Sequence, residues 1–151
     1  MQNHLVKLRI LLLLLVVLTF NGCQKQYPVN IPYKTFDFTI NILDPYYVNL
    51  QGVGGSMMID GGSRGLIIYR VSIEQFNVYE RHCTYDSENA CGKVSFDTSG
   101  IILVDDDCGG SGCGSKFNII DGSVTNGPAQ YPLIQYNAVF DGVAILRLYN
   151  N

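Results

Sequence analysis

Short apolar stretches separated by clusters of glycine, asparagine, aspartate and proline run through most of this chain. Residues 36–42 alternate apolar and polar side chains, as in a strand with one buried face, and residues 65–71 form the continuous apolar run typical of a central strand. Comparable runs follow at residues 76–80, 93–96, 100–104, 116–120, 132–140 and 143–149. The pattern predicts about eight to ten short strands, and therefore an all-β fold, a small antiparallel sandwich or barrel.

The segments between these runs have the composition of turns. Residues 97–100 separate two apolar runs and predict a hairpin. The glycine clusters at residues 51–56 and 60–65 suggest phosphate-binding loops at first sight. Such loops need a helix behind them to supply aligned N–H groups, and no helix is predicted there. We therefore interpret both clusters as hairpin turns or bulges.

The N-terminus is typical of an exported protein. Lys7 and Arg9 precede an apolar run at residues 10–18, which is short for a membrane span. The segment "LTFNGC" ends at Cys23 and resembles a bacterial lipobox, in which the cysteine is lipidated and becomes the mature N-terminus. We expect a lipoprotein signal peptide at residues 1–22 and lipidation of Cys23. The alternative is an ordinary signal peptide with an incidental cysteine.

The remaining chain predicts one domain behind a tether. Residues 23–34 contain prolines and show no clear period, so we expect a lipid-anchored linker there and a single β domain at residues 35–151. This organisation places the protein in the bacterial cell envelope, attached to a membrane through its N-terminal lipid. The formal net charge is −3 and no run of basic residues is present, which argues against nucleic acid as a partner.

Four further cysteines lie in two loops bounded by predicted strands. Cys83 and Cys91 belong to the first loop, and Cys108 and Cys113 belong to the second, which is rich in glycine. If the loops converge at one tip, their sulfur atoms can surround a metal. Export to an oxidising compartment also permits disulfides between them.

The second loop and the chain after it resemble the cluster-binding end of a Rieske domain. In that family the loop is followed by Gly-Ser-x-Phe, a glycine turn, Gly-Pro-Ala and Pro-Leu. The matching positions are Gly114, Ser115, Phe117, Gly122, Gly127, Pro128, Ala129, Pro132 and Leu133. The resemblance covers residues 36–149. It implies a Rieske-like fold with both cysteine-bearing loops at one tip, a [2Fe–2S] cluster, and electron transfer with a redox protein partner.

The ligand positions depart from the family pattern, in which two Cys and two His hold the cluster. Tyr85 and Cys113 occupy the two histidine positions, and His82 is the histidine that remains after loss of the signal peptide. Cys83 and Cys113 match ligand positions most directly, whereas Cys91 and Cys108 are inferred to complete the set.

Three states of the four cysteines therefore stay open. The first is a [2Fe–2S] cluster with four Cys ligands, which serves in electron transfer. The second is zinc or another single metal ion with a structural role. The third is a set of disulfides that staple the same loops, without metal, in a structural or interaction lipoprotein.

Other polar residues near the cysteines predict no further site. His82 neighbours Cys83, so its side chain faces the other way in an extended chain, and a surface or capping role is expected. We expect Asp105, Asp106 and Asp107 to form a solvated turn rather than a calcium site, with a charge that disfavours a nearby free thiolate. No nucleophile–base arrangement is recognisable, so the sequence supports electron transfer at most, and not an enzyme active site.

Overall fold

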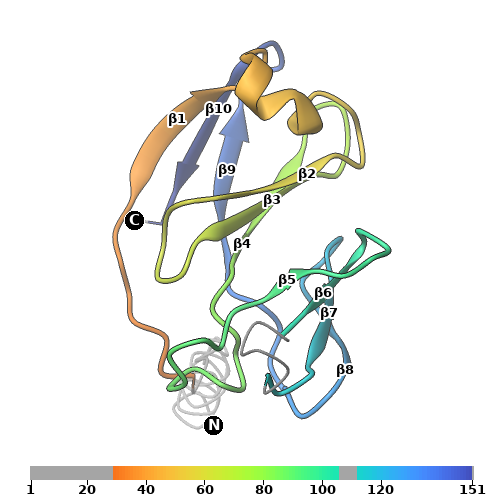
Figure 1. Ribbon diagram of the computed structural model, residues 1–151. Helices are drawn as coiled ribbons and strands as arrows, with labels where there is room; N and C mark the ends of the chain where they lie inside the picture. Colours follow the sequence, from red (N-terminus) through yellow and green to blue (C-terminus); the bar gives the residue numbers. More distant parts are fainter. Residues whose placement is uncertain (1–28, 106–111, 151) are drawn as a thin grey trace, which may run out of the picture.

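The computed structural model describes residues 29–105 and 112–150 (Figure 1). Cys23, Cys108, Asp106 and Asp107 lie outside the described residues. The described elements are strands and one short 3-10 helix, η1. They are β1 (Asp37–Asn41), η1 (Pro45–Leu50), β2 (Ser56–Ile59), β3 (Leu66–Arg70), β4 (Phe76–Glu80), β5 (Ser95–Phe96), β6 (Ile102–Val104), β7 (Lys116–Asn118), β8 (Val124–Asn126), β9 (Gln135–Phe140) and β10 (Ile145–Tyr149). The expected class is confirmed: the domain is all-β and antiparallel.

The strands form two sheets, and the second sheet is an insertion into the first. The larger sheet has the order β1-β10-β9-β4-β3-β2, with antiparallel pairing throughout. The smaller sheet has the order β5-β6-β7-β8 and is built entirely from chain between β4 and β9. Both cysteine-bearing loops belong to this insertion, because the first joins β4 to β5 and the second joins β6 to β7. Figure 1 shows the smaller sheet below the larger one, toward the end where the described chain begins.

Strands β3 and β4 are buried on both faces, which explains their nearly continuous apolar sequence. Leu66, Ile68 and Val78 join a core cluster with residues of β1, β10 and η1, so the larger sheet curls over itself. Ile67 and Tyr79 point to the opposite face and join a second cluster. That second cluster also contains residues of the first loop, the smaller sheet and the chain after β7, namely Cys83, Val94, Leu103, Phe117, Ile119, Ala129 and Leu133. Cys113 of the second loop packs against the cluster. The loops are therefore positioned by the core between the two sheets.

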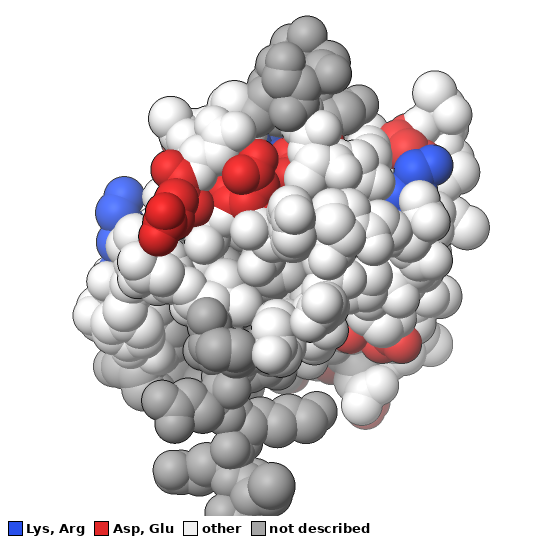
Figure 2. Space-filling model, turned by 90° about the horizontal axis from the view of Figure 1, so that it is seen from below, with Lys and Arg blue, Asp and Glu red and all other residues white. Residues whose placement is uncertain are grey.

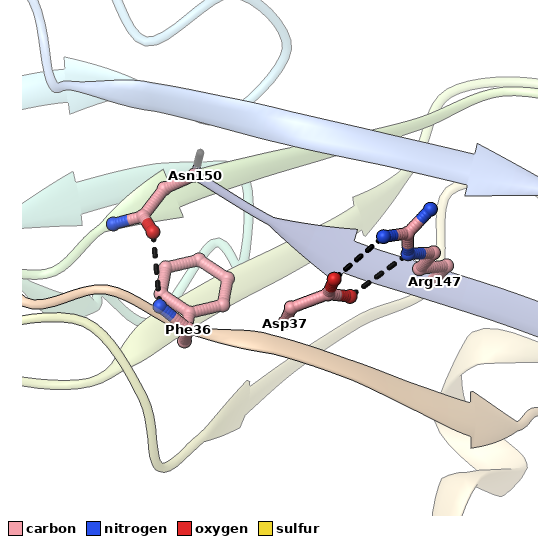
Figure 3. Close-up of polar contacts among 4 residues, drawn as sticks. All are labelled: Phe36, Asp37, Arg147 and Asn150. Atoms are coloured by element: carbon pink, nitrogen blue, oxygen red, sulfur yellow. Dashed lines mark hydrogen bonds and ion pairs between the residues drawn. The ribbon is translucent and has the colours of Figure 1, made fainter.

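The two ends of the domain are joined at the edge of the larger sheet (Figure 3). Asp37 in β1 accepts two hydrogen bonds from the guanidinium of Arg147 in β10, one of them 2.8 Å from Nε to Oδ1. The backbone N–H of Phe36 donates to the side-chain oxygen of Asn150 over 2.9 Å. The side chain of Asn150 also donates to the carbonyl of Lys34 over 2.7 Å. The last residues before β1 are thus held against the end of β10.

Most predicted strands are present, and three elements were missed. The hairpin at residues 97–100 is confirmed, with Asp97 accepting from the backbone N–H of Ser99 over 2.8 Å. Residues 60–65 form the expected turn of a hairpin, between β2 and β3. Strands β2 and β8 and the helix η1 were not predicted. Within residues 29–105 and 112–150, no helix is long and apolar enough to cross a membrane. On the face drawn in Figure 2, basic side chains are scattered singly and form no patch.

Candidate metal centre

The first loop begins beside a buried carboxylate. Glu80 ends β4 and is fully buried, and its oxygens accept hydrogen bonds from the backbone N–H groups of Ser63, Arg64 and His82 over 2.6–3.0 Å. Its Oε2 also accepts from the Tyr136 hydroxyl over 3.0 Å. These contacts tie the β2–β3 turn and β9 to the end of β4. The chain therefore leaves β4 in a fixed direction, three residues before Cys83.

Cys83 lies in the core and not on an exposed loop. Its backbone N–H donates to the carbonyl of Gly92 over 3.0 Å, and His82 pairs with Lys93 as an isolated bridge. The side chain of Cys83 is fully buried in the cluster between the sheets. The thiol is therefore immobilised by packing on one side and by the loop's own backbone pairing on the other.

Asp105 continues the strand alternation of β6 into the second loop. Leu103 points into the core, Val104 points away, and Asp105 again points inward, where it is fully buried. Its backbone N–H donates to the Ser115 carbonyl, and its carbonyl accepts from the Gly114 N–H, each over 3.0 Å. The expectation of a solvated turn is wrong for Asp105, because this pairing places its carboxylate at a core position.

Cys113 is held by the residues that form the Gly-Ser and Gly-Pro-Ala motifs. Ser115 Oγ lies 3.0 Å from Cys113 Sγ and accepts a hydrogen bond from the Ala129 N–H over 3.1 Å. Gly127, at φ 105°, lets the later segment approach Ser115 closely: a Cβ at this position would lie 2.5 Å from the Ser115 Cα. The motifs therefore support the second loop from behind.

Three ligand-type side chains meet between the two loops. The sulfur atoms of Cys83 and Cys113 are 3.7 Å apart, and Cys113 Sγ is 3.1 Å from Asp105 Oδ2. One ligand atom from each of Cys83, Asp105 and Cys113 lies within 4.8 Å of the others. The sequence predicted Cys83 and Cys113 as ligands, but it did not predict Asp105 as one. The sequence signal that could have indicated burial of Asp105 is its position two residues after Leu103, which places both side chains on the same face of an extended strand.

The environment favours protonated thiols when no cation is present. Burial raises the pKa of the Cys83 thiol far above its ordinary value, and the neighbouring Asp105 adds to this rise against opposing backbone hydrogen bonds. Burial likewise raises the pKa of Cys113, with Asp105 again acting in the same direction. The effect expected of the acidic segment on Cys108 lies outside the described residues. A bound cation would replace these protons and reverse the electrostatic cost.

The other predicted cysteines are in a different state or outside the described chain. Cys83 and Cys113 are free, whereas Cys91 is disulfide-bonded, and its partner is not among the described residues. A sulfur in a disulfide is not a thiolate ligand. The described residues thus bring together two sulfurs and a carboxylate, whereas the sequence predicted a set of four cysteine ligands. The assignment of Cys91 and Cys108 as ligands stays a prediction.

His82 is buried rather than at the surface, and both of its ring nitrogens have partners. Nδ1 lies 3.0 Å from the Ser63 hydroxyl, and Nε2 lies 2.7 Å from the carbonyl of Ser87. This pattern assigns the proton to Nε2, since a carbonyl only accepts. Burial lowers the pKa of His82, so the ring is neutral. The residue joins the β2–β3 turn to the first loop and is not directed toward the thiols.

The [2Fe–2S] cluster implied by the family resemblance needs four ligands, two on each iron. Cys83 and Cys113 can supply two thiolates, and Asp105 a carboxylate. The nitrogens of His82 are engaged elsewhere, and Cys91 is oxidised. The described residues therefore do not fit a complete cluster, and we derive no electron-transfer step from one. They do fit a single metal ion.

An open groove of about 620 Å³ lies beside the first loop. Thr84, Asp86 and Glu88 line one side, and Gln130 and Tyr131 line the other. None of the three metal-ligand candidates lines this groove.

Comparison with known proteins finds a weak structural similarity. No family model and no curated protein matches this sequence. Among solved structures, the chain is similar to one described as a complex of reduced oxygenase and oxidised ferredoxin in carbazole 1,9a-dioxygenase, at 22% sequence identity and a TM-score of 0.47. The match covers 78% of this chain and 96% of that chain. At this level it concerns the arrangement of strands alone and says nothing of a ligand.

Proposed function

We propose that this protein is a lipoprotein of the bacterial cell envelope whose β domain binds one metal ion through the thiolates of Cys83 and Cys113. We prefer zinc because Zn²⁺ binds both thiolate and carboxylate ligands in proteins and does not change its oxidation state. The membrane attachment rests on the lipobox-like segment that ends at Cys23.

A single observation carries the metal assignment, namely the 3.7 Å separation of the two free sulfur atoms. Two thiolates that share one tetrahedral zinc at about 2.3 Å lie about 3.8 Å apart. The two cysteines come from loops separated by a whole β-hairpin, so local chain geometry does not impose this distance. This arrangement supports a structural metal at the junction of the two sheets.

Metal analysis and a visible spectrum of the full-length protein, purified without air, test the proposal. We expect about one zinc per chain, no visible colour, and loss of the metal in the variants Cys83→Ser and Cys113→Ser. The matched control is the double variant Cys91→Ser/Cys108→Ser, which should keep the metal. A four-thiolate [2Fe–2S] cluster predicts the reverse, a brown protein that loses its colour in the control variant, and would restore electron transfer with a redox protein partner as the leading function.

The disulfide state of Cys91 favours a second candidate, a non-redox lipoprotein whose loops are stapled by disulfides alone. In that case Cys83 and Cys113 would close a further bridge, which their separation permits after a small movement. The protein would then bind no metal, and its denatured mass would be lower by about two daltons for each bridge than after reduction.

A further inference from the structure

The carboxylate of Asp105 is the least satisfied polar group at the site. Its side chain is fully buried, and Oδ2 accepts a hydrogen bond from the Cys113 thiol over 3.1 Å. Oδ1 has no hydrogen-bond donor within the part of the chain that the structure describes. A buried carboxylate oxygen without a donor is unfavourable unless a cation or a proton compensates it. Glu80, the other buried carboxylate of this region, shows the contrast, because it accepts four hydrogen bonds.

We infer, on the premise that the proposed thiolate site binds metal, that Asp105 is the third ligand and that the centre has the donor set Cys83, Asp105 and Cys113. One ligand atom from each residue lies within 4.8 Å of the other two, so small side-chain movements bring all three to the spacing of about 3.3–3.8 Å around one zinc ion. Zinc accepts aspartate oxygens at about 2.0–2.2 Å beside thiolates. The ion supplies the partner that Oδ1 lacks.

The backbone holds Asp105 in the ligand position whether or not an ion is bound. Its N–H and carbonyl pair with Ser115 and Gly114, directly beside Cys113. Asp105 and Cys113 are therefore presented by two paired segments of one hairpin, and Cys83 is presented from the core side. Three protein ligands leave one position of a tetrahedral ion for water or a small exchangeable ligand, as in zinc sites that are not closed.

Cobalt(II) titration of the full-length protein, kept free of air, tests this donor set. Co²⁺ occupies zinc sites and gives absorption bands that report thiolate ligation and coordination number. We expect Asp105→Asn to weaken Co²⁺ binding by about 100-fold or more, whereas the charge-matched control Asp86→Asn changes it by less than about threefold. Asp86 lies in the first loop but outside the group of three.

A second variant tests the same position by gain of signal. In Asp105→Cys, the new sulfur would join the two existing thiolates. The sulfur-to-cobalt charge-transfer absorbance per bound ion should then rise by about half, since two thiolates become three. This readout stays informative if Asp105→Asn does not fold, because it needs only a folded cysteine variant with bound metal.

The outcomes separate the inference from the proposed function. Loss of affinity in Asp105→Asn, or the added absorbance in Asp105→Cys, supports Asp105 as a ligand. Wild-type binding with unchanged affinity in Asp105→Asn overturns the inference but leaves the thiolate site standing. Unchanged absorbance per ion in a folded, metal-bound Asp105→Cys variant overturns it as well. If the wild-type protein binds neither Co²⁺ nor Zn²⁺, the proposed function itself fails.

Discussion

Gly127 lies against the backbone of Ser115, and substitution of Gly127 by alanine tests how much this close contact contributes to stability. Its φ is 105°, and a Cβ would lie 2.5 Å from the Ser115 Cα, which cannot move without disturbing the second loop. We expect Gly127→Ala to lower the free energy of unfolding by roughly 3 kcal/mol or more, from the positive φ and the overlap together. Denaturant unfolding measures the change.

Gly142 provides the matched control for this substitution. Its φ is 84°, and no atom lies within 4 Å of the Cβ that alanine would add. Gly142→Ala should therefore cost only about 1–2 kcal/mol, the cost of the positive φ alone. If the two variants lose the same free energy of unfolding, the close approach of Gly127 to Ser115 does not contribute to stability.

Glu80 is the residue on which the start of the first loop depends. Its four donors are three backbone N–H groups and the Tyr136 hydroxyl. In Glu80→Gln, an NH₂ group would face donors where an oxygen now accepts. We expect a loss of roughly 2–4 kcal/mol in the free energy of unfolding, because the donors are buried and have no alternative partner.

The exposed Glu74 is the control for Glu80, since Glu74→Gln makes the same chemical change on the surface. That variant should unfold within about 0.5 kcal/mol of the wild type. A similarly small change for Glu80→Gln would mean that the hydrogen-bond network rearranges without cost.

At the residue scale, the two thiols of the site could be predicted from the sequence, but the residues around them could not. Cys83 and Cys113 were recognisable because sulfur in paired loops has few roles. Asp105 was misinterpreted because adjacent acidic residues usually mark a solvated turn, and its burial depends on pairing with Ser115, which composition does not reveal. His82 was expected at the surface, but its partners Ser63 and Ser87 come from segments on either side of it. Tertiary pairing decided each of these cases.

At the scale of elements, Tyr79 links β4 of the larger sheet to the turn between β7 and β8. Its hydroxyl donates to the carbonyl of Ile120 over 3.0 Å, and burial raises its pKa from 10.0 to about 12. A raised pKa means that the folded state favours the protonated phenol. Its contribution to stability is therefore complete below pH 10.0 and is lost as the pH rises toward 12.

Tyr79→Phe tests this linkage by its dependence on pH. At neutral pH the variant should be less stable than the wild type by about 1 kcal/mol, the value of one hydrogen bond. The difference should shrink as the pH rises above about 10, because only the wild type loses stability through this phenol. Urea unfolding of both proteins across this range measures the effect. Parallel curves would contradict the assignment of the shift to Tyr79.

Whether a strand could be predicted from the sequence depends on how its burial shapes the order of apolar and polar residues. β3 and β4 were predicted at nearly their observed bounds, since burial on both faces produces continuous apolar runs. β2 was missed because its four residues are all only partly buried and follow a glycine cluster. β8 has two exposed positions of three, so it carries no alternation. η1 is a short helix that begins at Pro45 behind the cap of Asp44, and its six residues are too few to show a period.

At the scale of the whole molecule, the proposed lipid anchor and the metal site are separate features that can be tested separately. Cys23→Ser should move the protein from the detergent phase to the aqueous phase on phase separation, because each buried CH₂ of the lipid contributes about 0.8 kcal/mol to membrane affinity. Cys113→Ser, which removes a thiol of the domain, should partition as the wild type does. Aqueous partitioning of both the wild type and Cys113→Ser would contradict lipidation.

Bound metal should strengthen the junction between the larger sheet and the inserted smaller sheet. Cys83 follows β4 of the larger sheet, whereas Asp105 and Cys113 flank β6 and β7 of the smaller one, so an ion at this point would tie the insertion to the main sheet.

Removal of the ion with a chelator should lower the free energy of unfolding by about 2.7 kcal/mol if the free metal concentration had been a hundred times its Kd. For a domain of this size that corresponds to a fall in Tm of roughly 10 °C. Scanning calorimetry before chelation, after it, and after Zn²⁺ is restored measures the change, and Cys83→Ser/Cys113→Ser should not respond. An unchanged Tm in the wild type would mean that bound metal contributes nothing to holding the two sheets together.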